Sequence, residues 1–211
     1  MLIDLHTHTC HLSSCSSLSL AELIARCRAA GLDGICLTEH DKMWSAEDLA
    51  QSTAPSDFLI LRGMEVSTVQ GHVLVYGLPG PVDGLWSLRR LREVADEYGA
   101  VLVKSHPLRD GHVKVRPDGT PRDGEIGMFA LYDALEIWSG GESDTANALA
   151  ASLARAYGFR GVGGGDVHAP SEVGRFATRF ERDILSEADL AAELRAGRFT
   201  AVDLRGVTGK K

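Results

Sequence analysis

Short apolar runs recur along this 211-residue chain, and most of them stop abruptly at residues that can bind metal ions or transfer protons. The runs read LIDLHTH, GICLTEHD, FLILRGMEVS, HVLVYG, AVLVKSHP, ALEIWSG and RGVGGGDVH. They are rich in Val, Ile and Leu, as buried parallel strands are. This pattern predicts a set of strands whose carboxyl ends carry the functional side chains.

Helical segments separate many of these runs. The segment SLAELIARCRAAG starts at Ser19, a helix N-cap with Glu22 three residues later, and Gly31 marks its end. Four further segments, SAEDLAQ, SLRRLREVADEYG, SDTANALAASLARAYG and SEADLAAELRAG, are also expected to be helices. Strands that alternate with helices predict a mainly parallel α/β fold.

The number of functional strand ends favours a barrel over an open sheet. An open doubly wound sheet gathers its ligands at one switch point, whereas a closed barrel brings all strand ends around one centre. The chain is shorter than the roughly 250 residues typical of an eight-unit barrel. We therefore expect a seven-stranded or distorted barrel, with the site at the carboxyl ends of its strands.

Histidines dominate the candidates at these strand ends. His6 and His8 are two residues apart in an extended segment, so they face the same side, and Asp166 and His168 repeat this spacing. The whole set comprises Asp4, His6, His8, Glu39, His40, Asp41, Glu65, His72, His106, Glu136, Asp166 and His168. Scattered surface histidines would not follow strand ends in this way, so the set predicts a metal site.

Glu65 gives a further argument for metal binding. It lies inside an apolar stretch, where an unpaired carboxylate costs several kcal/mol, and a bound metal ion would remove that cost. The alternatives, a loop histidine for His40 and an edge-strand residue for His72, stay open. Imidazole and carboxylate donors without thiolates suit zinc, iron or manganese. More than four ligands imply more than one ion, and Glu65 can bridge two.

Composition excludes several other classes of protein. Apolar residues make up 44% and charged residues 24% of the chain, as in ordinary globular proteins. No apolar run suits a transmembrane helix or a signal peptide, and the four cysteines form no C-x-x-C pair, so we expect a cytoplasmic protein without membrane contact. A net charge of −7 disfavours wrapping of long nucleic acid. A small phosphorylated substrate or a short oligonucleotide remains compatible with it.

Five of these motifs occur in an order that resembles the PHP (polymerase and histidinol phosphatase) superfamily. They are DLHTH, TEHD, GMEVS with the following GH, SHP and GGDVH, and they extend from Asp4 to about Arg175. The resemblance implies one PHP-type domain over residues 1–211, folded as a distorted (β/α)7 barrel with two or three divalent metal ions at the strand ends. It also implies hydrolysis of phosphate esters.

The resemblance also implies a distribution of ligands. The first ion would be held by His6, His8, Glu65 and Asp166, the second by Glu65, His72 and His106, and a third with help from His40 and His168. Three-metal members of the superfamily supply a His or Asp after the first motif, where this chain reads TCHLSSCSS. His11 or Cys15 is an alternative donor there, but the serines lead us to expect two firmly held ions and a weak or absent third.

Other residues are expected to support the chemistry. Asp4 and Asp41 would orient imidazoles through the nitrogen that does not face the metal. Arg109, which follows His106, and Arg175 are candidate phosphate clamps, with a plain surface position as the alternative. Two rival functions remain: an amidohydrolase that uses a modified lysine, for which Lys104 is the strand-end candidate, and a non-catalytic metal-binding domain. The sequence leaves monoester and diester substrates, and the oligomeric state, undecided.

Overall fold

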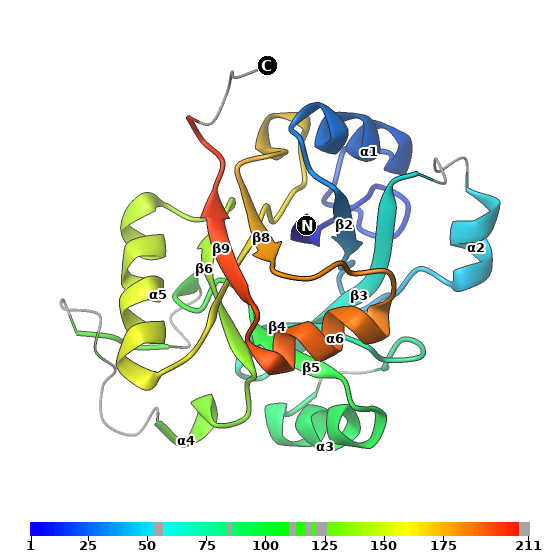
Figure 1. Ribbon diagram of the computed structural model, residues 1–211. Coiled ribbons are helices and arrows are strands. Elements are labelled where there is room, and N and C mark those ends of the chain that lie inside the picture. Colours follow the sequence, from blue (N-terminus) through cyan, green and yellow to red (C-terminus); the bar gives the residue numbers. More distant parts are fainter. Residues whose placement is uncertain (53–56, 84–85, 110–112, 117–119, 121–125, 207–211) are drawn as a thin grey trace.

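The computed structural model describes residues 1–52, 57–83, 86–109, 113–116, 120 and 126–206, and within them one sheet contains nine strands (Figure 1). The order across the sheet is β7-β6-β5-β4-β3-β2-β1-β8-β9. The strands are β1 (Leu2–Thr7), β2 (Gly34–Leu37), β3 (Leu59–Thr68), β4 (Gly71–Tyr76), β5 (Val101–Lys104), β6 (Ala134–Ser139), β7 (Gly161–Gly164), β8 (Phe176–Phe180) and β9 (Phe199–Asp203).

Two sets of parallel strands form most of the sheet. β1, β2 and β3 are parallel neighbours, and so are β5, β6 and β7. β4 runs antiparallel between these sets, and a tight turn joins it to β3. β8 and β9 add antiparallel strands beyond β1. The expected α/β barrel is confirmed, and the antiparallel strands are its distortion.

The two ends of the sheet approach each other, which makes the barrel nearly closed. Beyond β7, the His8 N–H donates to the Val167 carbonyl at 3.0 Å, and the Val167 N–H donates to the His6 carbonyl at 3.3 Å. In β8, the Thr178 hydroxyl donates to the Gly163 carbonyl and accepts from the Gly163 N–H, both at 2.9 Å. Figure 1 shows β9 beside β6 at this closure.

The helices begin where the sequence places serine caps. They are α1 (Leu20–Ala29), α2 (Ala46–Gln51), α3 (Leu88–Tyr98), α4 (Ile126–Phe129), α5 (Asp144–Tyr157) and α6 (Glu187–Ala196), with a short 3-10 turn, η2, at Pro170–Glu172. Five of them start after a serine whose hydroxyl accepts a backbone N–H of the first turn: Ser19, Ser45, Ser87, Ser143 and Ser186. The five expected helices are therefore confirmed, and α4 is an addition.

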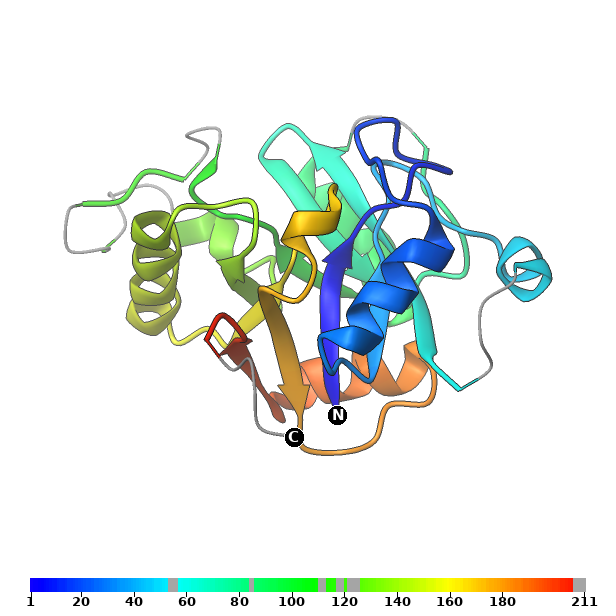
Figure 2. The ribbon, with the colours of Figure 1, turned by 90° about the horizontal axis from the view of Figure 1, so that it is seen from above.

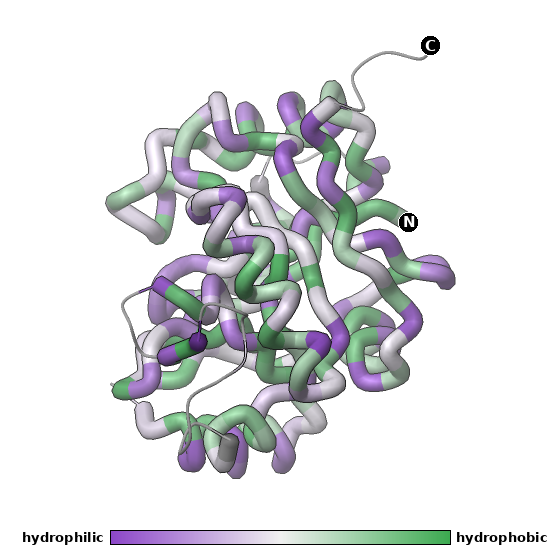
Figure 3. Tube along the Cα trace, turned by 90° about the vertical axis from the view of Figure 1, so that its left-hand side faces the viewer, coloured by the Kyte–Doolittle hydropathy of each residue, from purple (hydrophilic) through white to green (hydrophobic). Residues whose placement is uncertain are grey.

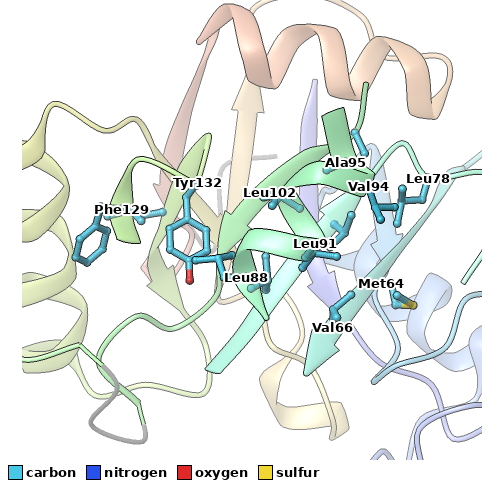
Figure 4. Packing of buried hydrophobic residues seen from close by; sticks show 14 of the residues in the cluster. Met64, Val66, Leu78, Leu88, Leu91, Val94, Ala95, Leu102, Phe129 and Tyr132 are labelled. Carbon is cyan, nitrogen blue, oxygen red and sulfur yellow. The ribbon is translucent and has the colours of Figure 1, made fainter. Parts of the chain in front are cut away.

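Apolar residues fill the barrel and the layer outside it. Inside, Ile3 and Leu5 are fully buried, and the Tyr76 hydroxyl donates to the Leu5 carbonyl at 2.7 Å. Outside, the buried face of α3 packs on β3 and β5, as Leu91 and Leu102 illustrate (Figure 4). Hydrophobic and hydrophilic residues alternate along the trace, as expected when one face of each helix covers the sheet (Figure 3).

The carboxyl ends of the parallel strands β1, β2, β3, β5, β6 and β7 point away from α6 (Figure 2). In Figure 2, β1 runs from the marked N-terminus toward the hairpin of β3 and β4, and α6 lies at the other end of the barrel. No helix in the described part of the chain has the length and apolar character needed to cross a membrane.

Candidate metal centre

Four buried side chains converge at the carboxyl ends of β1, β3 and β7. His6 Nε2 lies 3.3 Å from Glu65 Oε2 and 3.4 Å from Asp166 Oδ1. His8 Nε2 lies 3.4 and 3.5 Å from the same two oxygens. The two-residue spacing of His6 and His8 therefore places both imidazoles on the same side of the chain, as the sequence indicates.

These four atoms satisfy the requirements of a metal site. None of them has a hydrogen bond, although all are buried, and buried polar atoms are normally paired. Ligands at about 2.0–2.1 Å from a tetrahedral zinc ion are separated by roughly 3.3–3.4 Å. The measured nitrogen-to-oxygen distances of 3.3–3.5 Å match this spacing. The donor set therefore fits a divalent cation.

Glu65 lies between two groups of imidazoles. Its Oε1 faces His72 Nδ1 at 3.1 Å and His106 Nε2 at 3.0 Å. Its Oε2 faces His40 Nδ1 at 3.0 Å, in addition to His6 and His8. Each oxygen of one buried carboxylate thus addresses different nitrogen donors, which is the arrangement that a bridging ligand needs.

The described residues form three sets of donors, and within each set the donor atoms all lie within 4.8 Å of one another. The sets are His6, His8, Glu65 and Asp166; His40, Glu65 and His72; and His8, His40 and His168. The first set is the one that the resemblance implies. The second set differs from the ligands implied for the second ion, because His40 joins Glu65 and His72, whereas His106 contacts Glu65 but belongs to none of the three sets. The third brings together the expected pair of His40 and His168.

The site opens to solvent on the side of His40, His72 and His168. Their side chains are 32%, 31% and 25% exposed, whereas His6 and His8 are fully buried. The His8 ring stacks on both His40 and His168, with centroids 4.5 and 4.3 Å apart. Among the described residues, these three imidazoles therefore form the most accessible part of the site.

Burial and neighbouring charges prepare the site for a cation. Burial lowers the pKa of His8 to about 4, which leaves a neutral imidazole, the form that binds metals. Burial opposes ionisation of Glu65, but the charge of His6, the hydrogen bond with His106 and the close contact of His40 outweigh it and hold the pKa of Glu65 well below its ordinary value. The site therefore presents an ionised carboxylate and a neutral imidazole side by side.

The backbone is left-handed at three non-glycine positions of the described chain. Asp41, His106 and Asp166 have φ values of 51°, 24° and 47°. Asp41 lies four residues beyond β2, and His106 and Asp166 lie two residues beyond β5 and β7. Such conformations cost about 1–3 kcal/mol each and cluster at functional sites.

Asp4 and Asp41, which the sequence suggests as groups that orient imidazoles, hydrogen-bond other groups beside the site. Asp4 Oδ1 accepts the backbone N–H groups of His6 at 3.1 Å and Gly165 at 2.7 Å, and burial raises its pKa to about 7. Asp41 accepts the backbone N–H and the hydroxyl of Ser67 at 2.7 and 2.6 Å. Both carboxylates thus anchor the chain beside ligands, and neither hydrogen-bonds an imidazole in the described structure.

Glu136, rather than Asp4, contacts an imidazole of the first donor set. On β6, its Oε1 lies 3.0 Å from His6 Nδ1, and its Oε2 accepts the His106 backbone N–H at 2.8 Å. The sequence signal was available, because Glu136 is a carboxylate inside the apolar run ALEIWSG. The run alone does not reveal which histidine faces it.

The serine-rich segment after His8 ties two strand ends together. The Ser16 hydroxyl bonds the His8 and His168 carbonyls at 3.0 and 3.3 Å, and the Ser17 hydroxyl donates to the His168 carbonyl at 3.1 Å. The two alternative donors, His11 and Cys15, belong to none of the three donor sets of the described residues. The His11 ring instead stacks on Trp44, with centroids 4.5 Å apart.

The two candidate arginines occupy different places. Arg109 donates from Nη2 to Asp166 Oδ2 and from Nε to Glu142 Oε1, both at 2.7 Å, so it touches the metal-facing carboxylate directly. Arg175 donates to the Gly140 carbonyl at 2.9 Å, in the loop between β6 and α5. The structure thus brings Arg109 to the metal centre and sets Arg175 against a neighbouring loop.

Comparison with known proteins agrees with this geometry. The family model described as PHP domain matches residues 4–109, half of the chain, and the model described as PHP-associated matches residues 144–199. The chain belongs to the PHP domain family.

Solved structures with the same fold share little sequence with the chain. PsfC from Pseudomonas syringae has a TM-score of 0.71 at 18% identity, over 96% of this chain and 91% of that one. A two-domain protein from Bacteroides vulgatus, containing a predicted PHP-like metal-dependent phosphoesterase, has a TM-score of 0.66 at 19% identity, over 96% of this chain and 64% of that one. Endonuclease Q, bound to a 27-mer duplex with an abasic lesion, has a TM-score of 0.63 at 17% identity, over 95% of this chain and 58% of that one. No curated protein matches by sequence.

Proposed function

We propose that this chain hydrolyses phosphoesters of a small phosphorylated substrate, such as a nucleotide, at a site for two divalent metal ions. Metal-dependent phosphoester hydrolysis follows from membership of the PHP family together with the converging donors. The observation that carries the proposal is Glu65, whose two oxygens face different imidazoles in a fully buried position. A single-ion site would not require both oxygens.

The chain offers ligands for two ions. His6, His8, Glu65 and Asp166 would hold one, and Glu65 with His72 and either His106 or His40 would hold the other. Zinc, manganese and iron suit such imidazole and carboxylate donors. When bound, paired divalent ions supply a hydroxide nucleophile at neutral pH and stabilise the charge of the attacking and leaving oxygens.

The protein's own residues position the substrate and the ligands. Arg109 fixes Asp166 and places a permanent positive charge beside it, where phosphate oxygens would otherwise meet mostly carboxylates. The partly exposed His40, His72 and His168 form the open side, where an imidazole can hold a proton for a leaving oxygen. Arg175 is a second candidate clamp only if its loop presents it to the substrate.

Two observations favour phosphoester over amide hydrolysis. Lys104 is buried and donates its Nζ to the His72 backbone carbonyl at 3.0 Å, which commits this strand-end lysine to holding β4. Glu65 occupies the bridging position that a modified lysine would fill in the rival class. A short oligonucleotide is an alternative substrate, because Endonuclease Q shares the fold and binds a DNA duplex.

The test begins with metal-free protein reconstituted with zinc, manganese or iron. Each form is assayed against phosphomonoesters, phosphodiesters, short oligonucleotides and a panel of amides. We expect turnover of at least one phosphoester that chelation abolishes and metal restores. Glu187→Gln, a change at the opposite end of the barrel where Glu187 pairs with Arg62, is the matched control and should behave as wild type. Turnover of amides alone, or no metal-dependent turnover, would reject the proposal.

A further inference from the structure

Glu136 contacts two parts of the metal centre although it belongs to none of the three donor sets of the described residues. It lies on β6 and is 1% exposed. Its Oε1 meets the Nδ1 of His6, and its Oε2 accepts the backbone N–H of His106. His6 belongs to the first donor set, and His106 contacts Glu65 on the side of the second. One carboxylate therefore joins β1 and β5 beneath the site.

The contact with His6 determines which imidazole nitrogen can face a metal. A carboxylate accepts hydrogen bonds and does not donate them, so it selects the form of His6 that carries its proton on Nδ1. The lone pair of Nε2 is then directed at Glu65 Oε2 and Asp166 Oδ1, 3.3 and 3.4 Å away. Such a carboxylate also raises the basicity of the imidazole toward a metal.

The contact with His106 stabilises a strained backbone. His106 has a φ of 24°, which is unfavourable for a residue with a side chain, and Pro107 follows it. Its buried N–H would lose its hydrogen bond without Glu136, which is unfavourable for a buried polar group. Glu136 thus helps to keep His106 Nε2 at 3.0 Å from Glu65 Oε1.

Gly164 on β7 provides the space for this arrangement. A Cβ at this position would lie 2.6 Å from the Cβ of His6 and 2.8 Å from Glu136 Oε1. Real Cβ atoms do not approach other atoms this closely, so any side chain at residue 164 would displace His6 or Glu136. The pairing of Glu136 with His6 therefore explains why residue 164, in the run GVGGGD, is a glycine.

We propose that Glu136 is a positioning residue that couples the two metal positions, by fixing the His6 tautomer on one side and the His106 backbone on the other. The inference rests on the proposed two-metal site and deepens it. It differs from the support given by Asp4, which bonds two backbone N–H groups next to the first set only. Loss of Glu136 should therefore weaken the binding of both ions, whereas loss of a residue that supports only one metal position would weaken the binding of one ion.

Glu136→Gln tests the coupling with little change in volume. A glutamine can present its oxygen to His6 or to the His106 N–H, but its amide nitrogen then faces the other donor. Zinc titration in the presence of a competing chelator, with metal analysis of the loaded protein, measures both dissociation constants. We expect each to rise by roughly 10- to 100-fold, as for other residues that orient metal-binding imidazoles. Glu187→Gln should leave both unchanged.

A spectroscopic readout separates this role from general loss of stability. In the zinc-loaded wild type, ¹⁵N-labelled His6 should show a protonated Nδ1, and Glu136→Gln should change that signal. Gly164→Ala, which perturbs the same contact from β7, should weaken both ions in the same way. If Glu136→Gln fails to fold, Gly164→Ala and Glu136→Asp carry the test.

Two results would overturn the coupling: weakening of one ion only, or unchanged dissociation constants with an unchanged His6 signal. A wild type that binds fewer than two zinc ions would overturn it as well. The proposed phosphoesterase activity fails separately, because two ions can bind with the expected coupling while no phosphoester is hydrolysed.

Discussion

The two ends of β1 differ sharply, although they are only a few residues apart. Ile3 and Leu5 are fully buried in the apolar interior of the barrel, and the Leu5 carbonyl accepts the Tyr76 hydroxyl. At the carboxyl end, His6 and His8 are equally buried, but their Nε2 atoms have no hydrogen bond. We call the apolar interior around Ile3 and Leu5 the lower layer, and the end of the barrel with His6 and His8 the upper layer. The polar groups of the lower layer are hydrogen-bonded within the protein, whereas the imidazole Nε2 atoms of the upper layer point at a shared position without a hydrogen bond.

This difference separates what holds the barrel together from what makes it functional. Close packing stabilises the lower layer without a ligand. The upper layer gathers buried carboxylates, imidazoles and left-handed backbone, each of which destabilises a protein on its own. A cation at the donors would satisfy them, so metal should stabilise the rim while the interior stays folded without it.

The largest effect is expected from Glu65→Ala. Removing the carboxylate that faces both groups of imidazoles should lower bound metal by more than one ion per chain and abolish phosphoester turnover. Metal analysis of the purified variant, with circular dichroism as the folding control, measures this. Full metal content in the variant would show that Glu65 does not bridge.

Leu5→Ala probes the lower layer of the same strand. Truncating a buried leucine in a packed core costs about 2–5 kcal/mol, so denaturant unfolding should show a loss in this range. The folded fraction should still bind the wild-type number of ions, because the Leu5 side chain supplies no donor atom. A change in metal stoichiometry at low denaturant would mean that the two layers are not separable.

Metal removal probes the upper layer as a whole. An ion present at 100 times its dissociation constant stabilises the folded state by about 2.7 kcal/mol. For a chain of this size, chelation should therefore lower Tm by roughly 5–10 °C. Differential scanning calorimetry with and without chelator measures the shift. An unchanged Tm would contradict the view that the rim depends on a cation.

Arg109→Ala tests a residue at the edge of the metal site. A charge-assisted hydrogen bond contributes about 1.5–3 kcal/mol, so kcat/KM for a phosphoester should fall by roughly ten- to a hundredfold. The contact with Asp166 adds an expectation that the sequence alone did not provide: the first ion should also bind more weakly. Chelator competition on this variant decides between a clamp for substrate only and a residue that also positions Asp166.

Arg175→Ala is the matched change with the smallest expected effect. Arg175 bonds the Gly140 carbonyl and contacts no donor of the metal centre. We expect a loss of about tenfold or less in kcat/KM, with metal affinity unchanged. Wild-type kinetics across all phosphoesters would place this arginine outside the substrate site.

The sequence predicted the strands that carry or lead into candidate ligands and missed those that do not. β1 to β7 are marked by apolar runs that contain His, Asp or Glu or lead directly into them, so their chemistry reveals them. β8, with the sequence FATRF, and β9, with FTAVD, are short, antiparallel and without a ligand at their ends. Their pairing depends on how the barrel closes on β1, which is a long-range contact that no local pattern encodes.

The candidate ligands were also easier to predict than their supports. The spacing of His6 and His8 places both on one face whatever the rest of the chain does. The partner of His6, in contrast, depends on β6 and β7 being folded against β1, with Gly164 leaving room for Glu136. Asp4, the nearest carboxylate in the sequence, bonds the backbone instead.

The left-handed backbone at Asp41, His106 and Asp166 has a consequence for how this protein responds to selection for stability. Glycine adopts such φ values without steric cost. A library screened for heat resistance alone would therefore tend to enrich glycine at these positions, and would discard two of the candidate donors, His106 and Asp166, along with the strain. Thermostable variants of this chain obtained without a metal-binding screen should accumulate inactive members, since stabilising changes at strained functional positions often reduce function.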